Sequence, residues 1–252
     1  MSKPIDVTRP SVARIYDYLL GGNLNYAVDR QLAESFLSEW PELAVSARAN
    51  RAWVRRVIRY LARDEGVDQF LDIGSGLPTA DNVHQVAQRI NPAARVLYVD
   101  NDPIVLAHGR ALLAEDGQTD YAEVDAREVS AVLAHAERHL DASRPVGVLM
   151  SSVLHYISEP PAEIVSGYVE WLRPGSFVAI THVTSDGVET ELARRLTEHY
   201  STQTPRPIEE IRAAFAGLEL VPPGMVDAPR WRPEGEIPTL VQPLIAGVGK
   251  VS

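Results

Sequence analysis

FLDIGSGLPT, residues 70–79, has the pattern of a buried strand that runs into a glycine turn. Its first four residues hold the short apolar run that is typical of a parallel strand covered on both faces. Gly74 and Gly76 have no Cβ, so the backbone can turn sharply there and approach a ligand closely. Apolar residues then recur at helical spacing over residues 83–90. A strand, a glycine turn and a helix in this order predict the edge of a doubly wound α/β sheet at which ligands bind.

Asp72 indicates which kind of ligand this turn accepts. A dinucleotide-binding fingerprint needs glycine or alanine at its sixth position, where this chain has Thr79 after Pro78. A dinucleotide also places a pyrophosphate at the turn, and a carboxylate two residues before the first glycine would repel it. The same carboxylate suits an ammonium or a sulfonium group, and S-adenosylmethionine carries both. A nicotinamide-dependent oxidoreductase is therefore the disfavoured alternative.

Composition excludes several classes of protein. A chain of 252 residues is long enough for one domain with an elaboration. The net charge of −10 disfavours binding to nucleic acid, which needs a positive surface. Without cysteine there is no disulfide, no thiolate metal site and no cysteine-held iron–sulfur cluster. No apolar run approaches the ~18 residues of a membrane helix and no signal-peptide pattern is present, so we expect a cytoplasmic protein without a membrane partner.

The chain divides into two predicted parts. Residues 1–64 are expected to form a helical cap or lid, with helices at 12–20, 28–38 and 44–63. Ser11 is the expected N-cap of the first helix. Residues 65–252 are expected to form a Rossmann-like domain in which strands and helices alternate. The strands are predicted at 70–73, 94–99, 121–124, 146–150, 177–183, 218–221 and 238–248. The helices between them are predicted at 83–90, 104–115, 128–140, 162–172, 188–200 and 208–215, and residues 222–237 are predicted to be loop.

Two acids follow predicted strands. Asp100 lies 26 residues after Gly74, close to the ~20 residues expected for an acid that binds ribose hydroxyl groups. Asp125 follows the third strand and could accept a hydrogen bond from the amino group of adenine. It could equally be the N-cap of the next helix, and the two roles are compatible.

These motifs resemble those of class I S-adenosylmethionine-dependent methyltransferases. The residues that carry the resemblance are Asp72-x-Gly74-x-Gly76, Asp100, Asp125-Ala126, Leu172–Ser176 and Phe215–Val221. More narrowly, nearly the whole chain resembles an actinobacterial family of uncharacterised S-adenosyl methyltransferases. The stretches shared with that family are Ile15–Gly22, Asn50-Arg51, Gly76–Thr79 and Val99–Pro103.

The resemblance implies a seven-stranded sheet with its last strand antiparallel and with helices on both faces. It implies that Gly74, Ser75 and Gly76 surround the methionine half of S-adenosylmethionine. The other implied contacts are Asp100 with the ribose, Asn101 and Asp125-Ala126 with the adenine, and Ser151 beside the transferring methyl group. The chain departs from the class at Pro78, which stands where a third glycine is common.

Three residues of the predicted helical part are further candidates for the cofactor site. Arg51 belongs to an arginine stripe on the third helix. Either Arg48 or Arg51, both near the start of that helix, binds an anionic group such as the cofactor's carboxylate, or the stripe is a solvated helix face. Tyr16 and Asn25 are expected to face the cofactor cavity, with the alternative that Tyr16 only packs its helix against the core.

Two histidines are candidates for a general base, should the acceptor have to lose a proton. His155 and His182 lie near the fourth and fifth strands, and each is either a base or a hydrogen-bonded structural residue. His135 and His139 have the i, i+4 spacing of a metal pair but no third ligand, so we expect a solvated helix face and no metal.

The sequence thus predicts a methyltransferase that uses S-adenosylmethionine to methylate a small molecule. The alternative is a regulatory protein that binds S-adenosylmethionine without transferring a methyl group, since no catalytic residue stands out. Nucleic acid is disfavoured as a partner by the acidic net charge. The acceptor and the oligomeric state are not determined by the sequence.

Overall fold

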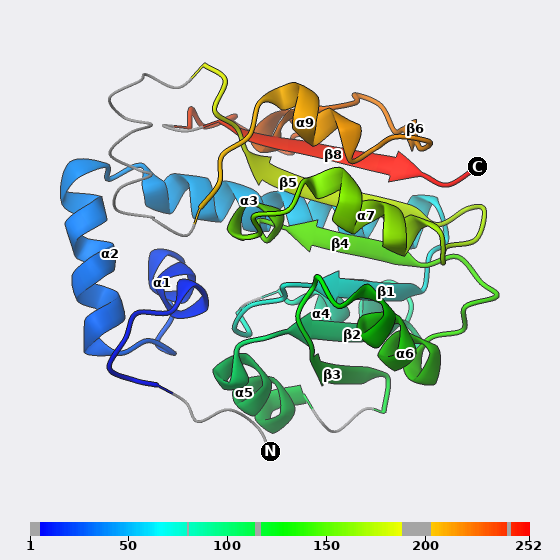
Figure 1. Ribbon diagram of the computed structural model, residues 1–252, viewed down its shortest axis with the longest axis horizontal. Helices are drawn as coiled ribbons and strands as arrows, with labels where there is room; N and C mark the ends of the chain where they lie inside the picture. Colours follow the sequence, from blue (N-terminus) through cyan, green and yellow to red (C-terminus); the bar gives the residue numbers. More distant parts are fainter. Residues whose placement is uncertain (1–5, 80, 114–116, 188–202, 241–242) are drawn as a thin grey trace.

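In the part of the chain that the structure describes, eight strands form one sheet whose main path runs β3-β2-β1-β4-β5-β8-β6, with β7 paired to β8 (Figure 1). The computed structural model describes residues 6–79, 81–113, 117–187, 203–240 and 243–252. The strands are β1 (Gln69–Ile73), β2 (Arg95–Asp100), β3 (Thr119–Glu123), β4 (Gly147–Ser151), β5 (Phe177–Val183), β6 (Glu219–Leu220), β7 (Val226–Asp227) and β8 (Leu244–Lys250).

The strand directions confirm the predicted sheet. β1 to β5 pair in parallel, and β8 runs antiparallel to both β5 and β6. The main path holds the seven strands that were expected. The prediction of loop over residues 222–237 was wrong in part. Val226 belongs to the short strand β7 and pairs with Ala246 of β8, and a 3₁₀ turn, η3 (Ala228–Arg230), follows β7. Two-residue strands leave no periodicity in a sequence, which is why this one was missed.

Helices connect the strands close to the predicted positions. They are α1 (Val12–Leu19), α2 (Ala27–Glu39), α3 (Leu43–Arg59) with a π-helical end η1 (Tyr60–Asp64), α4 (Val83–Gln88), α5 (Pro103–Leu113), α6 (Val129–His139), η2 (Leu154–Tyr156), α7 (Pro161–Val169) and α9 (Ile208–Ala213). The helix predicted over residues 188–200 lies outside the described residues.

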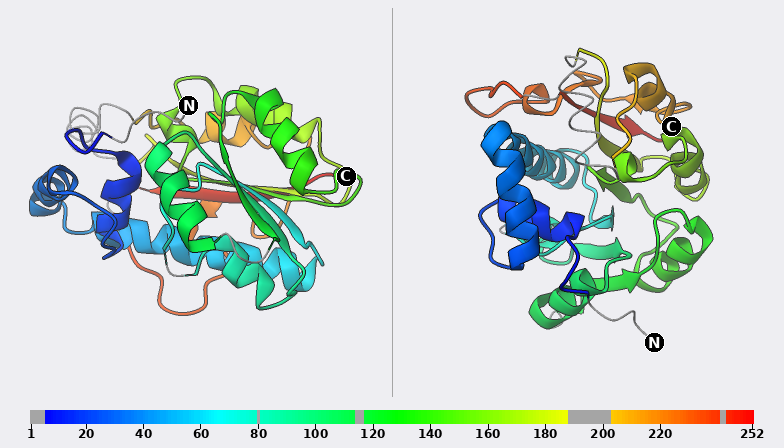
Figure 2. Two further views of the ribbon diagram at one scale, coloured as in Figure 1. Left: turned by 90° about the horizontal axis from the view of Figure 1, so that it is seen from below. Right: turned by 60° about the vertical axis from the view of Figure 1, so that its left-hand side comes forward.

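Side chains that alternate along the strands build a core on each face of the sheet. Phe70 and Phe177 point to the face covered by α3 and α4, where they pack with Trp53. Leu71 and Val178, one residue further along the same strands, pack on the face covered by α6, α7 and α9. Figure 2 shows the sheet edge-on between these two helical layers. Burial of both strand faces explains the continuous apolar runs in the sequence.

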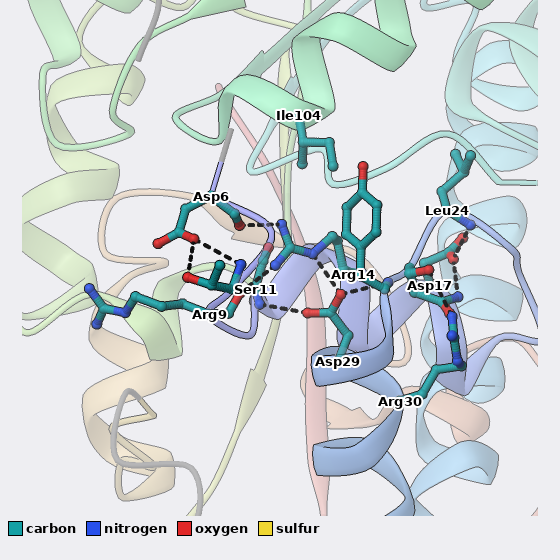
Figure 3. Close-up of polar contacts among 12 residues, drawn as sticks. Asp6, Arg9, Ser11, Arg14, Asp17, Leu24, Asp29, Arg30 and Ile104 are labelled. Carbon is teal, nitrogen blue, oxygen red and sulfur yellow. Dashed lines mark hydrogen bonds and ion pairs between the residues drawn. The ribbon is translucent and has the colours of Figure 1, made fainter. Parts of the chain in front are cut away.

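α1 and α2 lie beyond the carboxyl ends of the parallel strands (Figure 1). A buried ion pair joins them, with Arg14 Nε 2.7 Å from Asp29 Oδ2. The same Asp29 carboxylate accepts hydrogen bonds from the backbone N–H groups of Ser11 and Tyr26 (Figure 3). These contacts hold the two short helices together as one unit. Among the helices described, none is long and apolar enough to cross a membrane.

Candidate cofactor and acceptor site

A cavity of about 850 Å³ opens at the carboxyl ends of β1 to β4, beneath α1, α2 and α3. It gathers twelve of the fourteen candidate site residues, because the carboxyl ends of parallel strands meet at one edge of a sheet. Those twelve are Tyr16, Arg51, Asp72, Gly74, Ser75, Gly76, Asp100, Asn101, Asp125, Ala126, Ser151 and His155. Asn25 and His182 are not among the described residues that line the cavity.

The glycine turn is fixed to the end of β2. The backbone N–H of Gly74 donates to the carbonyl of Val99 at 2.8 Å, and that of Gly76 donates to Asp100 Oδ2 at 2.9 Å. Both glycines have a positive φ, +67° and +66°. A Cβ at Gly74 would overlap the side chain of Val153, whereas one at Gly76 would meet no atom within 4 Å. The turn therefore presents bare backbone and open space to a ligand.

Asp100 lies at the carboxyl end of β2 and lines the cavity. Its Oδ1 accepts a hydrogen bond from the backbone N–H of Asp102 at 2.9 Å, so each carboxylate oxygen already has one donor. Each oxygen of a carboxylate can accept a second hydrogen bond, which leaves capacity for two hydroxyl groups. Burial raises the pKa of Asp100, and the backbone hydrogen bonds oppose that shift.

Asp125 is engaged by neighbouring side chains. Arg127 contacts it through two hydrogen bonds, Nε to Oδ1 at 2.9 Å and Nη2 to Oδ2 at 2.8 Å. Asn101 Nδ2 donates to Oδ2 at 3.0 Å. The Arg127 guanidinium holds the pKa of Asp125 far below its usual range. The N-cap role for Asp125 is wrong, because α6 begins at Val129 and Glu128 is its N-cap.

Asp72 is an acid inside the cavity, only 6% exposed. Burial raises the pKa of this carboxyl to about 7, and the positive charge of Arg51 opposes the shift. A buried carboxyl in this state gains from a cationic ligand, because an opposite charge stabilises its ionised form.

Arg51 has different surroundings from the other arginines of the stripe. It alone among these arginines lines the cavity, where Nη2 donates to the carbonyl of Asp81 at 3.1 Å and Nε has no partner among the described residues. Arg55 and Arg59 form ion pairs with Asp81 and Glu234 on the surface, and Arg48 is exposed. The solvated-face interpretation therefore holds for the stripe but not for Arg51.

Asn50 is a central residue of the site that the sequence analysis did not single out as a site residue. It is 3% exposed and donates from Nδ2 to Tyr16 Oη and to Ser151 Oγ, both at 3.0 Å. Its Oδ1 accepts a hydrogen bond from Thr181 Oγ1 at 2.8 Å. Asn50 thus joins α1, β4 and β5, and it orients Ser151. These partners lie up to 131 residues away in sequence, so only the shared stretch Asn50-Arg51 pointed to it.

Asn25 lies in the turn between α1 and α2, where its side chain hydrogen-bonds to neighbouring residues of the same turn and helices. Its Nδ2 donates to Asp17 Oδ2 at 2.8 Å and to the carbonyl of Gly22 at 3.1 Å. Its Oδ1 accepts a hydrogen bond from Arg30 at 3.1 Å. The side chain therefore closes the turn between α1 and α2 and is not among the described residues that line the cavity.

The two candidate bases differ in access to the cavity. His155 is 2% exposed, lines the cavity, and has an Nδ1 without a partner among the described residues. His182 lies behind it, with ring centroids 5.4 Å apart and its Nδ1 bound to the carbonyl of Val183 at 2.7 Å. Burial lowers the pKa of His155 well below 6.5 and that of His182 to about 4, so both rings are neutral at pH 7.

His135 and His139 do not share a solvated face, contrary to the expectation. His139 is buried, and its Nε2 binds the carbonyl of Gln118 at 2.9 Å. No group of three metal-binding side chains occurs among the described residues.

The cavity fits S-adenosylmethionine by its donor set. Four buried polar atoms in its lining have no partner among the described residues, namely Ser46 Oγ, Arg51 Nε, Ser75 Oγ and His155 Nδ1. Buried polar groups are nearly always hydrogen-bonded, so such atoms indicate a polar ligand. Arg51 suits a carboxylate, Asp72 suits a cation, and Asp100 suits vicinal hydroxyl groups.

Comparison with known proteins agrees with this geometry. A family model described as S-adenosyl methyltransferase matches residues 1–252. A structure from Thermobifida fusca YX, a methyltransferase of inferred activity, is 41% identical, has a TM-score of 0.92, and covers 98% of this chain and 97% of its own. A DUF574 family protein from Streptomyces avermitilis MA-4680 is 35% identical with a TM-score of 0.92, over 99% and 100% of the two chains.

More distant structures share the fold. The N-methyltransferase NodS from Bradyrhizobium japonicum WM9, in complex with S-adenosyl-L-homocysteine, is 14% identical with a TM-score of 0.51 over 94% of this chain and 98% of its own. A search of the curated proteins found no match. The family model, the two relatives above 30% identity and the site together identify the chain as a member of the S-adenosyl methyltransferase family, an S-adenosylmethionine-dependent methyltransferase.

Proposed function

We propose that this methyltransferase methylates a small molecule inside the cavity, with α1 and α2 acting as a cap over the reacting groups. The observation that carries the proposal is that α1 and α2 line the same cavity as the glycine turn and the strand ends. Residues 10–13, Ile15 and Tyr16 line it from one side, and the glycine turn and strand ends line it from the other. A cavity of about 850 Å³ is in the range of small-molecule sites.

The cap is fastened at two points beside the proposed cofactor site. Ser11 Oγ donates to Asp102 Oδ2 at 2.7 Å, and Tyr16 Oη donates to the carbonyl of Ala47 at 3.1 Å. A sheet of this class leaves its ligand open to water at the strand ends, and methyl transfer benefits from a dry site. We therefore assign residues 1–64 a lid function, with α1 and α2 as its covering part.

The proposed cofactor contacts follow the chemistry of the lining. Gly74, Ser75 and Gly76 would surround the methionine half, with Arg51 at its carboxylate and Asp72 at its positive charges. The remaining contacts would be Asp100 with the ribose, Asn101, Asp125 and Ala126 with the adenine, and Ser151 beside the methyl group. S-adenosylmethionine supplies an activated methyl group, so the protein's task is to orient the acceptor and to exclude water.

His155 is the proposed general base for an acceptor that must lose a proton. Its ring lines the cavity and is neutral, so it can accept a proton at pH 7. His182 is proposed only to pack behind it, because it does not line the cavity among the described residues.

A titration on the whole protein tests the proposed site. Thermal unfolding is followed with S-adenosylmethionine, S-adenosylhomocysteine or NAD, for the wild type, Asp100→Ala and the control Asp120→Ala, which is exposed on β3. A ligand at ~100 times its dissociation constant stabilises by about 2.7 kcal/mol. We expect both sulfur compounds to stabilise the wild type and the control, and Asp100→Ala to respond weakly.

Two outcomes would contradict the proposal. Stabilisation by NAD alone would overturn the cofactor site. Binding of S-adenosylmethionine without formation of S-adenosylhomocysteine from any member of a small-molecule acceptor library would favour a regulatory binding protein instead.

A further inference from the structure

Charge is divided unevenly over the lining of the cavity. The charged side chains among its described lining residues are Arg51, Asp72, Asp100, Asp102, Asp125 and Arg127. The five besides Arg51 lie at or just after the carboxyl ends of β1, β2 and β3, and Arg51 lowers the pKa of Asp72 through its charge. We call this part the cofactor half, because it holds the proposed contacts to S-adenosylmethionine.

The lining that α1, α2, α3, β5 and β8 contribute is mostly apolar, and we call it the acceptor half. α1, α2 and α3 contribute Leu19, Phe36, Leu43 and Val54 to it, and β5 and β8 contribute Val183 and Leu244. No lining residue described on these elements carries a charge, apart from Arg51 on the cofactor side. Tyr16 on α1 and Asn50 on α3 belong to this lining, and Asn50 donates hydrogen bonds to both Tyr16 Oη and Ser151 Oγ, so the acceptor half adjoins the place proposed for the methyl group.

Two buried polar atoms of the lining outside the proposed cofactor contacts have no partner among the described residues. They are Ser46 Oγ on α3, in the acceptor half, and His155 Nδ1 on η2. A buried polar group without a hydrogen bond costs free energy, so a ligand that supplies a hydroxyl or amino group would be favoured there. The neutral imidazole of His155 offers an acceptor for such a group.

We propose that the acceptor is an uncharged, largely apolar small molecule that carries a hydroxyl or an aromatic amino group, bound in the acceptor half. This inference rests on the proposed function. A carboxylate or phosphate would lose its hydration in the acceptor half and find no described cation there, whereas an apolar ring would gain from burial. The acceptor's oxygen or nitrogen lone pair forms the bond to the methyl carbon, the carbon–sulfur bond breaks with its electron pair on sulfur, and the acceptor's proton passes to His155.

Matched probe molecules test this selectivity on the full-length protein loaded with S-adenosylhomocysteine. Isothermal titration compares 2-naphthol and 1-naphthylamine with 3-hydroxy-2-naphthoate and 1-naphthyl phosphate. We expect at least tenfold tighter binding of the two uncharged probes. Equal or tighter binding of the anionic probes, or no binding of either uncharged probe up to its solubility limit, would overturn the proposal.

A charge placed in the acceptor half should invert the selectivity. Leu19→Lys puts a cation on the half-buried lining of α1, and Leu32→Lys does the same from α2 if the first variant fails to fold. Leu20→Lys is the matched control, since Leu20 is half-buried beside Leu19 but is not among the described lining residues. We expect the lining variant to bind 3-hydroxy-2-naphthoate at least tenfold more tightly than the wild type, and the control to show no gain.

The titration with S-adenosylhomocysteine separates the two levels of inference. If that compound does not bind, the proposed function fails. If it binds and the probes show no preference for the uncharged members, only the proposed acceptor class fails.

Discussion

Ser11 on the cap and Asp102 after β2 are joined by a hydrogen bond of 2.7 Å between Oγ and Oδ2, across 91 residues of sequence. Ser11 precedes α1 as its N-cap, yet its hydroxyl makes no capping hydrogen bond to the helix. The predicted position is confirmed, and the hydroxyl instead connects the cap to the loop that follows Asp100.

Ser11→Ala should loosen the cap over the cofactor. The lost hydrogen bond to a carboxylate is worth ~1.5 kcal/mol, so we expect roughly tenfold weaker binding of S-adenosylmethionine, mainly through faster dissociation. Stopped-flow dissociation kinetics measure this. Ser38→Ala, an exposed serine on α2 that donates to the carbonyl of Ser35, is the control. An unchanged dissociation rate in Ser11→Ala would show that this contact does not fasten the lid.

Asp72 should make cofactor binding depend on pH. Its pKa of about 7 means that the carboxyl is largely protonated at pH 6 and ionised at pH 8. A bound cation favours the ionised form, so affinity should rise from pH 6 toward pH 8, with one proton released at the lower pH. Titration calorimetry in buffers of different ionisation enthalpy measures that proton. Asp72→Asn should bind S-adenosylmethionine more weakly than the wild type at pH 8, and its affinity should not change with pH. If its affinity still rises from pH 6 to pH 8, another group causes the pH dependence.

The same carboxyl should affect the stability of the ligand-free protein. Because burial raises its pKa, its contribution to the free energy of unfolding is fully present below the unfolded value near pH 4 and is lost as the pH rises through 7. Asp72→Asn, which stays neutral, should therefore unfold at a higher temperature than the wild type at pH 8. Thermal unfolding of both proteins at pH 5 and pH 8 tests this sign. A lower unfolding temperature for Asp72→Asn than for the wild type at pH 8 would contradict it.

Gly74→Ala should lower the free energy of unfolding by more than the strain of its backbone conformation alone would. A Cβ there would overlap Val153, and the positive φ adds a cost of ~1–2 kcal/mol for any residue with a Cβ. Gly66→Ala is the matched control, with a φ of +71° and no atom within 4 Å of the added Cβ. Urea denaturation should show a clearly larger loss at Gly74 than at Gly66, and equal losses would mean that Val153 moves aside without cost.

Arg14→Met should strongly destabilise the cap unit. It leaves the carboxylate of Asp29 buried without its cation, which typically costs ~3–5 kcal/mol (Figure 3). Arg55→Met removes an exposed ion pair with Asp81, 3.9 Å long, and should cost at most ~1 kcal/mol. Hydrogen exchange of α1 and α2 locates the effect. Equal protection in both variants would show that the buried pair does not hold these helices.

His155→Gln should lower kcat by roughly 10²–10⁴-fold while S-adenosylmethionine binds as before, if the acceptor loses its proton to this ring. His182→Gln is the comparison, because it is also buried but does not line the described part of the cavity. At saturating S-adenosylmethionine the kcat of the wild type should stay flat down to pH 6, since burial keeps the pKa of His155 well below 6.5. Equal losses in the two variants would indicate a structural role for both rings.

The sequence alone predicted the sheet, the glycine turn and the acids at the strand ends. These features depend on periodicity and turn chemistry within a few consecutive residues, and parallel strands bring such ends together. Where features were shorter, as in β7, or depended on distant partners, as in the environment of His139, the prediction was incomplete or wrong.

What the sequence determined is the class of fold and the identity of the residues at one edge of the sheet. Tertiary structure decided which partners those residues have: Asn50 with Ser151 and Thr181, Ser11 with Asp102, and Asn101 with Asp125. It also decided the raised pKa of Asp72 and the division of the cavity into charged and apolar halves. Burial and long-range contacts exist only once distant segments pack together, so no local pattern in the chain records them.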